Sequence, residues 1–384
     1  MGLRATTGRV LAVALLAVAL AVSAGLDAVA KSGPATVRHQ SAANGVAVAG
    51  RSPARAGPIV PVHGATSPAT SAPGPPAPAI PAGPVALAGC PPPPSPPGRP
   101  APGPPWHPPV LVPEPALPAP PPPAPRLPSP AALSGKGLWI WQLPATEHGD
   151  VAAIVSKATQ AGLHQLWVRV ADSRDGFYAP SQLAALVPAA HRAGLAVIGW
   201  GFPYLYDPVA DAVWTQQALG WRGPDGGRLD GFAADIETPS EGTALSARRA
   251  VTYLGFARPA AQGRPLVATV FPPTNHNLST MPYAAMAPYV DAFAPMMYWG
   301  CTDPGAYAQL ALANLGTLAP VHLIGQAYNM ADEGGRPASP SSAEILRFLA
   351  VARSGGAVGA SLWSWQEMTG EEYGALASFP WAGG

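Results

Sequence analysis

The sequence carries little net charge and has no cluster of lysine or arginine. Its 384 residues include 22 Lys and Arg against 21 Asp and Glu, a formal net charge of +1 at pH 7. Nucleic acids and anionic surfaces attract proteins through concentrated positive charge. We therefore expect no nucleic-acid partner.

Several catalytic patterns are also missing. No Gly-rich dinucleotide fingerprint follows the first expected strand, and the chain has neither a phosphate-binding loop nor a nucleophile elbow. The histidines lack the spacing of metal ligands. We therefore expect no metal and no cofactor. The histidines in question are His148, His191, His276 and His322.

Cysteine is scarce, with only Cys90 and Cys301. A disulfide between them and two free or separately paired thiols are both compatible with the sequence. The stretch Leu87 to Cys90 resembles a lipoprotein acylation box. Such a box closes an N-terminal signal, whereas this one lies far beyond it, which argues against acylation.

Residues 1–30 have the features of an export signal. Two arginines and no acid precede the apolar stretch Val10 to Leu26, and small residues that suit cleavage follow at Ala28 to Ala30. The alternative is an uncleaved anchor, because the run reaches the lower limit of about 17 residues for spanning a bilayer. We expect a secreted protein or one of the cell envelope.

Residues 31–134 are almost all Pro, Ala, Gly, Ser and Val. Too few large apolar side chains are present to offset the entropy of ordering, and repeated prolines favour an extended spacer. We expect a disordered Pro-rich linker that holds the following domain away from a membrane surface or cell wall.

Residues 135–384 have the length of one (β/α)₈ domain, about 250 residues. Apolar runs alternate with segments of helical spacing, such as Val151 to Ala158 and Leu183 to Ala190. This alternation predicts a parallel sheet covered by helices, and eight repeats favour a closed TIM barrel in one domain. The expected strands are Leu138–Leu143, Gln165–Ala171, Ala196–Phe202, Gly231–Glu237, Leu266–Phe271, Ala292–Trp299, His322–Tyr328 and Ala360–Trp365.

Polar and aromatic residues collect where these expected strands end, which is where such barrels build their active sites. Aromatic faces suit the apolar faces of pyranose rings. Trp139 and Trp167 lie further back, and we expect them to fill the barrel. The strand-end residues are Trp141, Gln142, Arg169, Asp172, Trp200, Tyr204, Asp235, Glu237, Tyr298, Trp299, Gln326, Tyr328, Trp363 and Trp365.

The run from Asp230 to Glu237 reads Asp-Gly-Phe-Ala-Ala-Asp-Ile-Glu. Alternate positions on a strand share a face, so Asp235 and Glu237 both point into the barrel. Two buried acids are costly unless function or a partner accounts for them, and their proximity keeps one proton on the pair. A purely structural pairing with Arg169 is the alternative.

At this run the sequence resembles glycoside hydrolase family 18, whose strand pattern is Asp-Gly-x-Asp-x-Asp-x-Glu. The stretches Met296 to Tyr298 and Gly359 to Trp363 resemble the family's Met-x-Tyr and Gly-x-x-x-Trp. Ala233 replaces the pattern's second Asp, Trp299 replaces an Asp that follows the Tyr, and Ser-x-Gly-Gly is missing from the second strand. The resemblance therefore implies a reaction class more firmly than a substrate. Family 25 lysozymes are the second choice.

The resemblance implies a role for each matched residue. Glu237 would protonate the leaving oxygen, Asp235 would orient the substrate's own acetamido group as nucleophile, and Tyr298 would hydrogen-bond to it. Trp363 would form the floor under the sugar. Further substrate contacts are expected at Asp230, Trp365, Gln326, Tyr328, Trp141, Trp200 and Arg169.

We expect a secreted, monomeric glycosidase that acts on a β-linked N-acetylhexosamine polysaccharide such as peptidoglycan or chitin. The alternative is a lectin-like barrel that binds carbohydrate without turnover. Retention of Glu237 favours the enzyme, because loss of activity usually begins at the acid.

Overall fold

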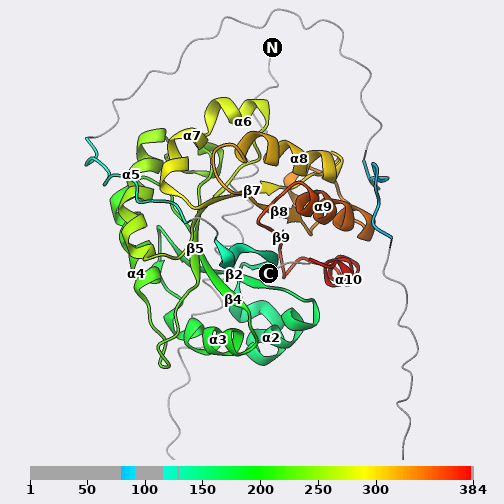
Figure 1. Cartoon of the computed structure of the whole chain (residues 1–384), viewed down its shortest axis with the longest axis horizontal. Helices are drawn as coiled ribbons and strands as arrows, with labels where there is room; N and C mark the ends of the chain where they lie inside the picture. The colour runs from blue at the N-terminus through cyan, green and yellow to red at the C-terminus, as the bar shows by residue number, and fades with distance from the viewer. Residues whose placement is uncertain (1–78, 91–115, 128–129, 382–384) are drawn as a thin grey trace, which may run out of the picture. The chain divides into compact units, whose positions relative to one another are not determined.

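The chain forms a closed barrel of eight parallel strands with helices on its outside (Figure 1). The computed structural model describes residues 79–90, 116–127 and 130–381. Pairing of β1 with both β2 and β9 closes the ring. The two-residue β3 (Gly176–Phe177) pairs antiparallel with β2 outside it. The barrel strands are β1 (Gly135–Ile140), β2 (Gln165–Asp172), β4 (Ala196–Phe202), β5 (Gly231–Asp235), β6 (Leu266–Val270), β7 (Ala292–Met297), β8 (His322–Gln326) and β9 (Gly359–Trp363).

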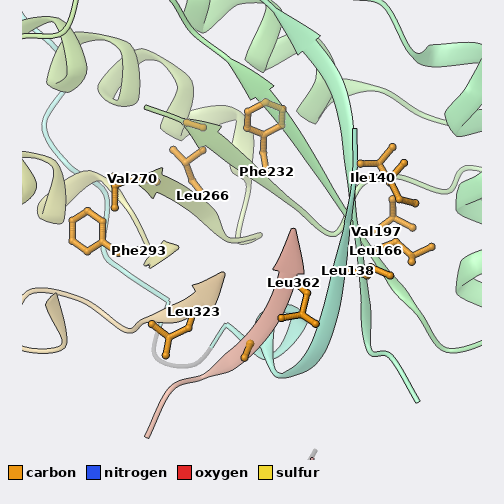
Figure 2. Packing of buried hydrophobic residues seen from close by; sticks show 14 of the residues in the cluster. Leu138, Ile140, Leu166, Val197, Phe232, Leu266, Val270, Phe293, Leu323 and Leu362 are labelled. Atoms are coloured by element: carbon orange, nitrogen blue, oxygen red, sulfur yellow. The ribbon is translucent and has the colours of Figure 1, made fainter. Parts of the chain in front are cut away.

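Each strand is buried on both faces, which explains its continuous apolar sequence. One face packs against the helices, as Figure 2 shows for Leu138, Phe232 and Leu362 among others. The opposite face fills the barrel with a separate cluster that includes Trp139 and Trp167. The expectation that these two indoles fill the interior is confirmed.

The helices begin at side chains that cap their free backbone N–H groups. Asp150 caps α2 and Asp207 caps α4, whereas Ser341 and Thr369 each form a capping box, at α9 and α10. The helices are α2 (Val151–Gln160), α3 (Pro180–Arg192), α4 (Pro208–Gly220), α5 (Ala247–Ala257), α6 (Asn275–Thr280), α7 (Tyr283–Met286), α8 (Pro304–Leu315), α9 (Ser342–Ser354) and α10 (Gly370–Ser378).

The predicted TIM barrel is confirmed, with strand boundaries displaced by a few residues. The first strand begins at Gly135, three residues before the expected Leu138. It ends at Ile140, so Trp141 follows it in the loop. The fourth expected strand ends at Asp235, which places Glu237 in the β5–α5 loop. The predicted helices around Val151 and Leu183 are α2 and α3.

Two pieces of the expected linker lie on the barrel. Cys90 forms a disulfide with Cys301 in the β7–α8 loop, and Arg336 donates a hydrogen bond to the Ala88 carbonyl at 2.5 Å. These pieces belong to the same compact unit as the barrel, so they pack with the domain that is expected to begin at residue 135. The rest of the linker and the expected signal, residues 1–30, lie outside the described residues.

The second piece, residues 116–127, covers a buried ion pair between Arg258 and Asp291. The backbone N–H of Leu127 donates to Asp291 at 2.9 Å. The guanidinium of Arg126 donates to the carbonyls of Ala287 and Val290 at 2.7 and 3.1 Å. Backbone and charged groups of the barrel thus provide the anchoring that the segment's own composition lacks.

No helix within the described ranges is both long and apolar enough to cross a bilayer.

Replacing Arg126 by Ala removes these side-chain bonds and leaves barrel carbonyls without their donor. We expect the free energy of unfolding to fall by about 1–3 kcal/mol in denaturant titrations. The control Arg222→Ala removes an exposed arginine that donates to the carbonyl of the adjacent Trp221, and it should change stability by less than about 0.5 kcal/mol. Equal stability of the two variants would show that residues 116–127 do not contribute to the fold.

Candidate functional site

The barrel interior is filled by indole rings that form the floor of the mouth. Trp139 stacks on Trp167 with ring centroids 4.7 Å apart, and its centroid lies 5.6 Å from that of Trp200. Trp363, at the end of β9, packs edge-on to Trp200 at 5.5 Å. Half-buried Trp141 packs against the same cluster. The predicted aromatic surface at the strand ends is therefore continuous with the core.

Three polar groups below this floor are paired with one another. The indole N–H of Trp139 donates to Ser361 Oγ at 2.8 Å, and Nε2 of the buried His322 lies 3.0 Å from the same oxygen. Burial lowers the pKa of His322 to about 4. His322 is therefore a neutral structural group near pH 7, and the chemistry has to be sought at the mouth.

Asp235 and Glu237 lie together at the mouth end of β5. The N–H of the intervening Ile236 donates to the Thr269 carbonyl of β6 at 2.9 Å. The Thr243 hydroxyl donates to the Glu237 carbonyl, also at 2.9 Å. These bonds extend the strand geometry past the last residue of β5 and fix both carboxyl groups near the floor.

Both carboxyl groups have raised pKa values. Withdrawal from water is the main cause, and it raises the pKa of Asp235 to about 7. The pKa of Glu237 lies well above its ordinary value because of burial first and then the neighbouring Asp235, Glu241 and Glu333. Glu237 therefore holds a proton near neutral pH, as a general acid must.

The positive charge of Arg169 acts on this pair. It lowers the pKa of Asp235 and so opposes the rise that burial causes. Its guanidinium lies over the ring of Trp200 at 5.5 Å and donates to Asp172 at 3.0 Å. Asp172 in turn accepts backbone N–H groups of its own loop. Arg169 Nε and Asp235 Oδ1 are two of the buried side-chain atoms that have no hydrogen-bond partner among the described residues.

Tyr298 and Tyr328 form a second wall of the site. Their rings meet edge to face at 5.4 Å, and the Tyr328 hydroxyl donates to Glu333 at 3.3 Å. Burial first, and then Tyr328, Asp235 and Glu237, raise the pKa of Tyr298 well above its ordinary value. Tyr298 thus stays protonated and can donate a hydrogen bond next to the carboxyl pair.

Sequence reasoning missed the acids on the surrounding loops. Glu241 lies in the β5–α5 loop, Glu333 in the β8–α9 loop, and Glu367 beyond β9, where it accepts from Ser364 at 2.7 Å. Glu241 and Glu333 raise the pKa of Glu237, and Glu367 raises that of Glu333. Their only signal in the sequence is a position shortly after an expected strand.

Asp230 does not lie at the mouth. It precedes β5, accepts the N–H of Val197 at 2.7 Å and lies 2.8 Å from the His191 ring. Both partners belong to the opposite end of the barrel, so the structure does not bring Asp230 together with the other expected site residues. Asp230 occupies the matching position of the motif, but the length of β5 separates it from the mouth.

Two further expected contacts are used by the protein itself. The Trp365 indole N–H donates to Glu147 at 2.8 Å, and its ring faces Lys157 among the outer helices, because the inward alternation ends with β9. The fully buried Gln326 accepts from the Gly300 N–H and donates to the Tyr328 carbonyl, both at 2.9 Å. Gln326 positions the wall rather than offering its amide to a ligand.

Within the described ranges, no three His, Cys, Asp or Glu side chains are grouped so that they could hold a metal ion. The groups that the mouth offers are a proton donor, an adjacent carboxylate, a phenol and an aromatic floor.

No protein-family model matches the chain, and no curated protein matches its sequence. Its fold is similar to solved structures. The spore cortex-lytic enzyme SleL of Bacillus cereus is 13% identical over 64% of this chain and 74% of that chain, with a TM-score of 0.48. A chitinase of Chromobacterium violaceum is 11% identical over 64% and 98%, with a TM-score of 0.47. A family 18 chitinase of Pseudoalteromonas aurantia is 12% identical over 64% and 100%, with the same TM-score. Similarity at this level assigns no activity.

Replacing Arg169 by Gln removes the charge that opposes the raised pKa of Asp235. The carboxyl should then keep its proton to higher pH, with a pKa increased from about 7 by about one pH unit. Carbon-13 NMR titration of the aspartate carboxyl groups measures this directly. Arg174→Gln is the matched control, because it removes the same charge from an exposed position in the adjacent loop. An unchanged titration in Arg169→Gln would contradict the assigned influence.

Proposed function

We propose that the barrel is a glycoside hydrolase that acts on a β-linked N-acetylhexosamine polysaccharide, of the peptidoglycan or chitin type. The observation that carries the proposal is the Asp235–Glu237 pair, held at the end of β5 beside the aromatic floor, with the pKa of Glu237 well above its ordinary value. A protonated acid next to a group that ionises more readily is the arrangement that glycoside cleavage requires.

In the proposed reaction Glu237 donates its proton to the glycosidic oxygen as the bond to the anomeric carbon breaks. By the resemblance to family 18, the substrate's acetamido oxygen forms the new bond to that carbon, so no protein nucleophile is needed. Asp235 stabilises the positive charge that develops on the acetamido group, and Tyr298 donates a hydrogen bond to it. The ionised Glu237 then accepts a proton from the water that opens the intermediate.

The proposed substrate agrees with the polarity of the mouth. Trp363 and Trp141 present aromatic surface to a pyranose ring. Arg169 and Asp235 add a positively charged group and a carboxyl group beside this surface.

Export to an oxidising compartment is part of the proposal. Disulfides persist in such compartments and are rare in the cytosol, and Cys90 is bonded to Cys301. We place the protein outside the cell or in its envelope, with the N-terminal segment as the means of association with wall or membrane, and as a monomer.

A carbohydrate-binding barrel without turnover is the second candidate. The specific observation in its favour is Ala233, which stands where the family pattern has an acid next to Asp235. Asp235 Oδ1 has no hydrogen-bond partner among the described residues.

Glu237→Gln keeps the size and hydrogen bonding of the side chain but removes the transferable proton. We expect the folded variant to lose turnover of chitin oligomers or peptidoglycan by about 10²-fold or more while still binding them, as followed by mass spectrometry of the products. Asp235→Asn should also lose rate without losing binding.

Asp230→Asn is the matched control, because this motif acid lies at the other end of β5 and should leave turnover unchanged. Unaltered hydrolysis by Glu237→Gln would refute its role as the acid. A parent protein that binds oligosaccharide without cleaving it would establish the binding barrel instead.

A further inference from the structure

A short piece of the chain before the barrel is attached to the loop that follows Tyr298. This piece, residues 79–90, is called the strap below. Its last residue, Cys90, is bonded to Cys301, three residues after Tyr298. No residue of the strap is buried, so it covers little apolar area, and its bonds to the barrel have to hold it in place. The mechanism described above makes no use of the strap.

Arg336 joins the strap to both loops that carry the wall of Tyr298 and Tyr328. Its buried guanidinium donates to the Ala88 carbonyl of the strap at 2.5 Å and to the Gly300 carbonyl of the β7–α8 loop at 3.3 Å. Its own carbonyl accepts the N–H of Met330 at 2.8 Å, two residues after Tyr328. Arg336 thus connects the strap with the residues that follow each tyrosine.

A buried ion pair fixes the position of Arg336. Glu344 of α9 accepts from the guanidinium through both of its oxygens, and neither side chain is exposed. The same carboxylate accepts the indole N–H of Trp299, the residue after Tyr298, at 3.2 Å. Since breaking a buried pair is strongly unfavourable, the two charges keep one arrangement. A displacement of Arg336 therefore also changes the support of Trp299.

Gln326 couples the two loops a second time. It accepts the N–H of Gly300 and donates to the Tyr328 carbonyl, both at 2.9 Å. The edge-to-face contact of the Tyr298 and Tyr328 rings at 5.4 Å completes the connection. A continuous set of contacts thus leads from the strap to the phenol that the proposed mechanism uses.

The disulfide is the covalent part of this attachment. Cys90 and Cys301 are the only cysteines of the chain, so a thiol reagent can reduce no other bond within it. A dithiol gives two electrons and two protons to the S–S bond, is itself oxidised to a disulfide, and leaves two thiols on the protein. The reduced strap keeps hydrogen bonds such as that of Ala88, but it loses the high local concentration that the covalent link provides.

We propose that the strap is a redox-dependent support for Tyr298, with Arg336 as its positioning residue, and that the protein reaches full activity only after the disulfide has formed. The proposal rests on the proposed function, because Tyr298 acts in the reaction stated there. Disulfides persist in oxidising compartments and are rare in the cytosol. An enzyme with this support stays less active until it has been exported.

Reduction of the full-length protein with dithiothreitol tests the proposal without a change of sequence. The substrate is a hexamer of β-1,4-linked N-acetylglucosamine or, if that is not cleaved, soluble peptidoglycan fragments. We expect reduction to lower kcat about fivefold and to change KM less than about twofold, because Tyr298 is needed more in the transition state than in the bound substrate. The double variant Cys90→Ser/Cys301→Ser should have the lower kcat with and without the dithiol. An unchanged kcat of the reduced parent overturns the proposal while the proposed function stands.

Tyr298→Phe separates support of this residue from a general loosening of the fold. The variant lacks the hydroxyl that the strap positions, so reduction should change its kcat less than about 1.5-fold, in contrast to the parent. Equal losses in the parent and in Tyr298→Phe overturn the proposal, because they show that the strap acts elsewhere.

Arg336→Lys keeps the charge but lacks the planar fork that reaches Ala88, Gly300 and Glu344 together. We expect kcat of the oxidised variant to fall about fivefold. Its matched control is Arg264→Lys, because Arg264 is also a buried arginine that donates to several backbone carbonyls, at the opposite end of the barrel. That control should lower the melting temperature but leave kcat unchanged. Equal kcat of the two variants overturns the role of Arg336.

If the parent cleaves neither substrate, the proposed function fails and hydrogen exchange decides on the strap. Faster amide exchange at residues 298–301 and 328–336 after reduction, with unchanged exchange at residues 173–175 of another mouth loop, supports a redox-dependent support of the wall. Equal exchange in the oxidised and reduced protein overturns it.

Discussion

The packing of tryptophan rings inside the barrel is the constraint on which the rest of the structure depends. Trp139 and Trp167 stack within the ring of strands because small residues such as Ala233 face them. Gly137 is required by this packing, since a Cβ there would lie 2.6 Å from the Trp167 ring nitrogen. Interleaved large and small side chains leave no channel through the barrel. A ligand of the barrel interior is therefore expected at the mouth, above Trp363.

The second constraint is electrostatic. Two carboxyl groups withdrawn from water at adjacent inward positions would repel each other strongly if both were ionised. The site reduces this cost because Glu237 keeps its proton and because Arg169 favours the ionised form of Asp235. Ala233 contributes as well, since an acid there would add a third charge to the same face of β5. The loop acids Glu241 and Glu333 support this arrangement, because they raise the pKa of Glu237 further and so strengthen its hold on the proton.

The sequence predicted those features that depend on short-range periodicity. Apolar runs identified the strands, and alternation within β5 predicted that Asp235 and Glu237 share a face. Alternation holds only within a strand, and β9 ends two residues before Trp365, so this reasoning does not place that side chain. A motif match does not say which end of the barrel Asp230 occupies. The loop acids Glu241, Glu333 and Glu367 were missed because the conformation of a loop depends on contacts that have no period in the sequence.

The segments before the barrel show how a chain that cannot fold by itself can pack against a folded domain. A proline-rich chain cannot form a core of its own, but it can complete one that has unsatisfied groups at its surface. Asp291 accepts the N–H of Leu127 as well as that of Leu266 and the guanidinium of Arg258, so the segment supplies one of several bonds to a buried charge. The disulfide of Cys90 adds a covalent constraint at the β7–α8 loop, directly after the wall formed by Tyr298. Disulfides persist in oxidising compartments, so the covalent docking of residues 79–90 depends on the proposed export.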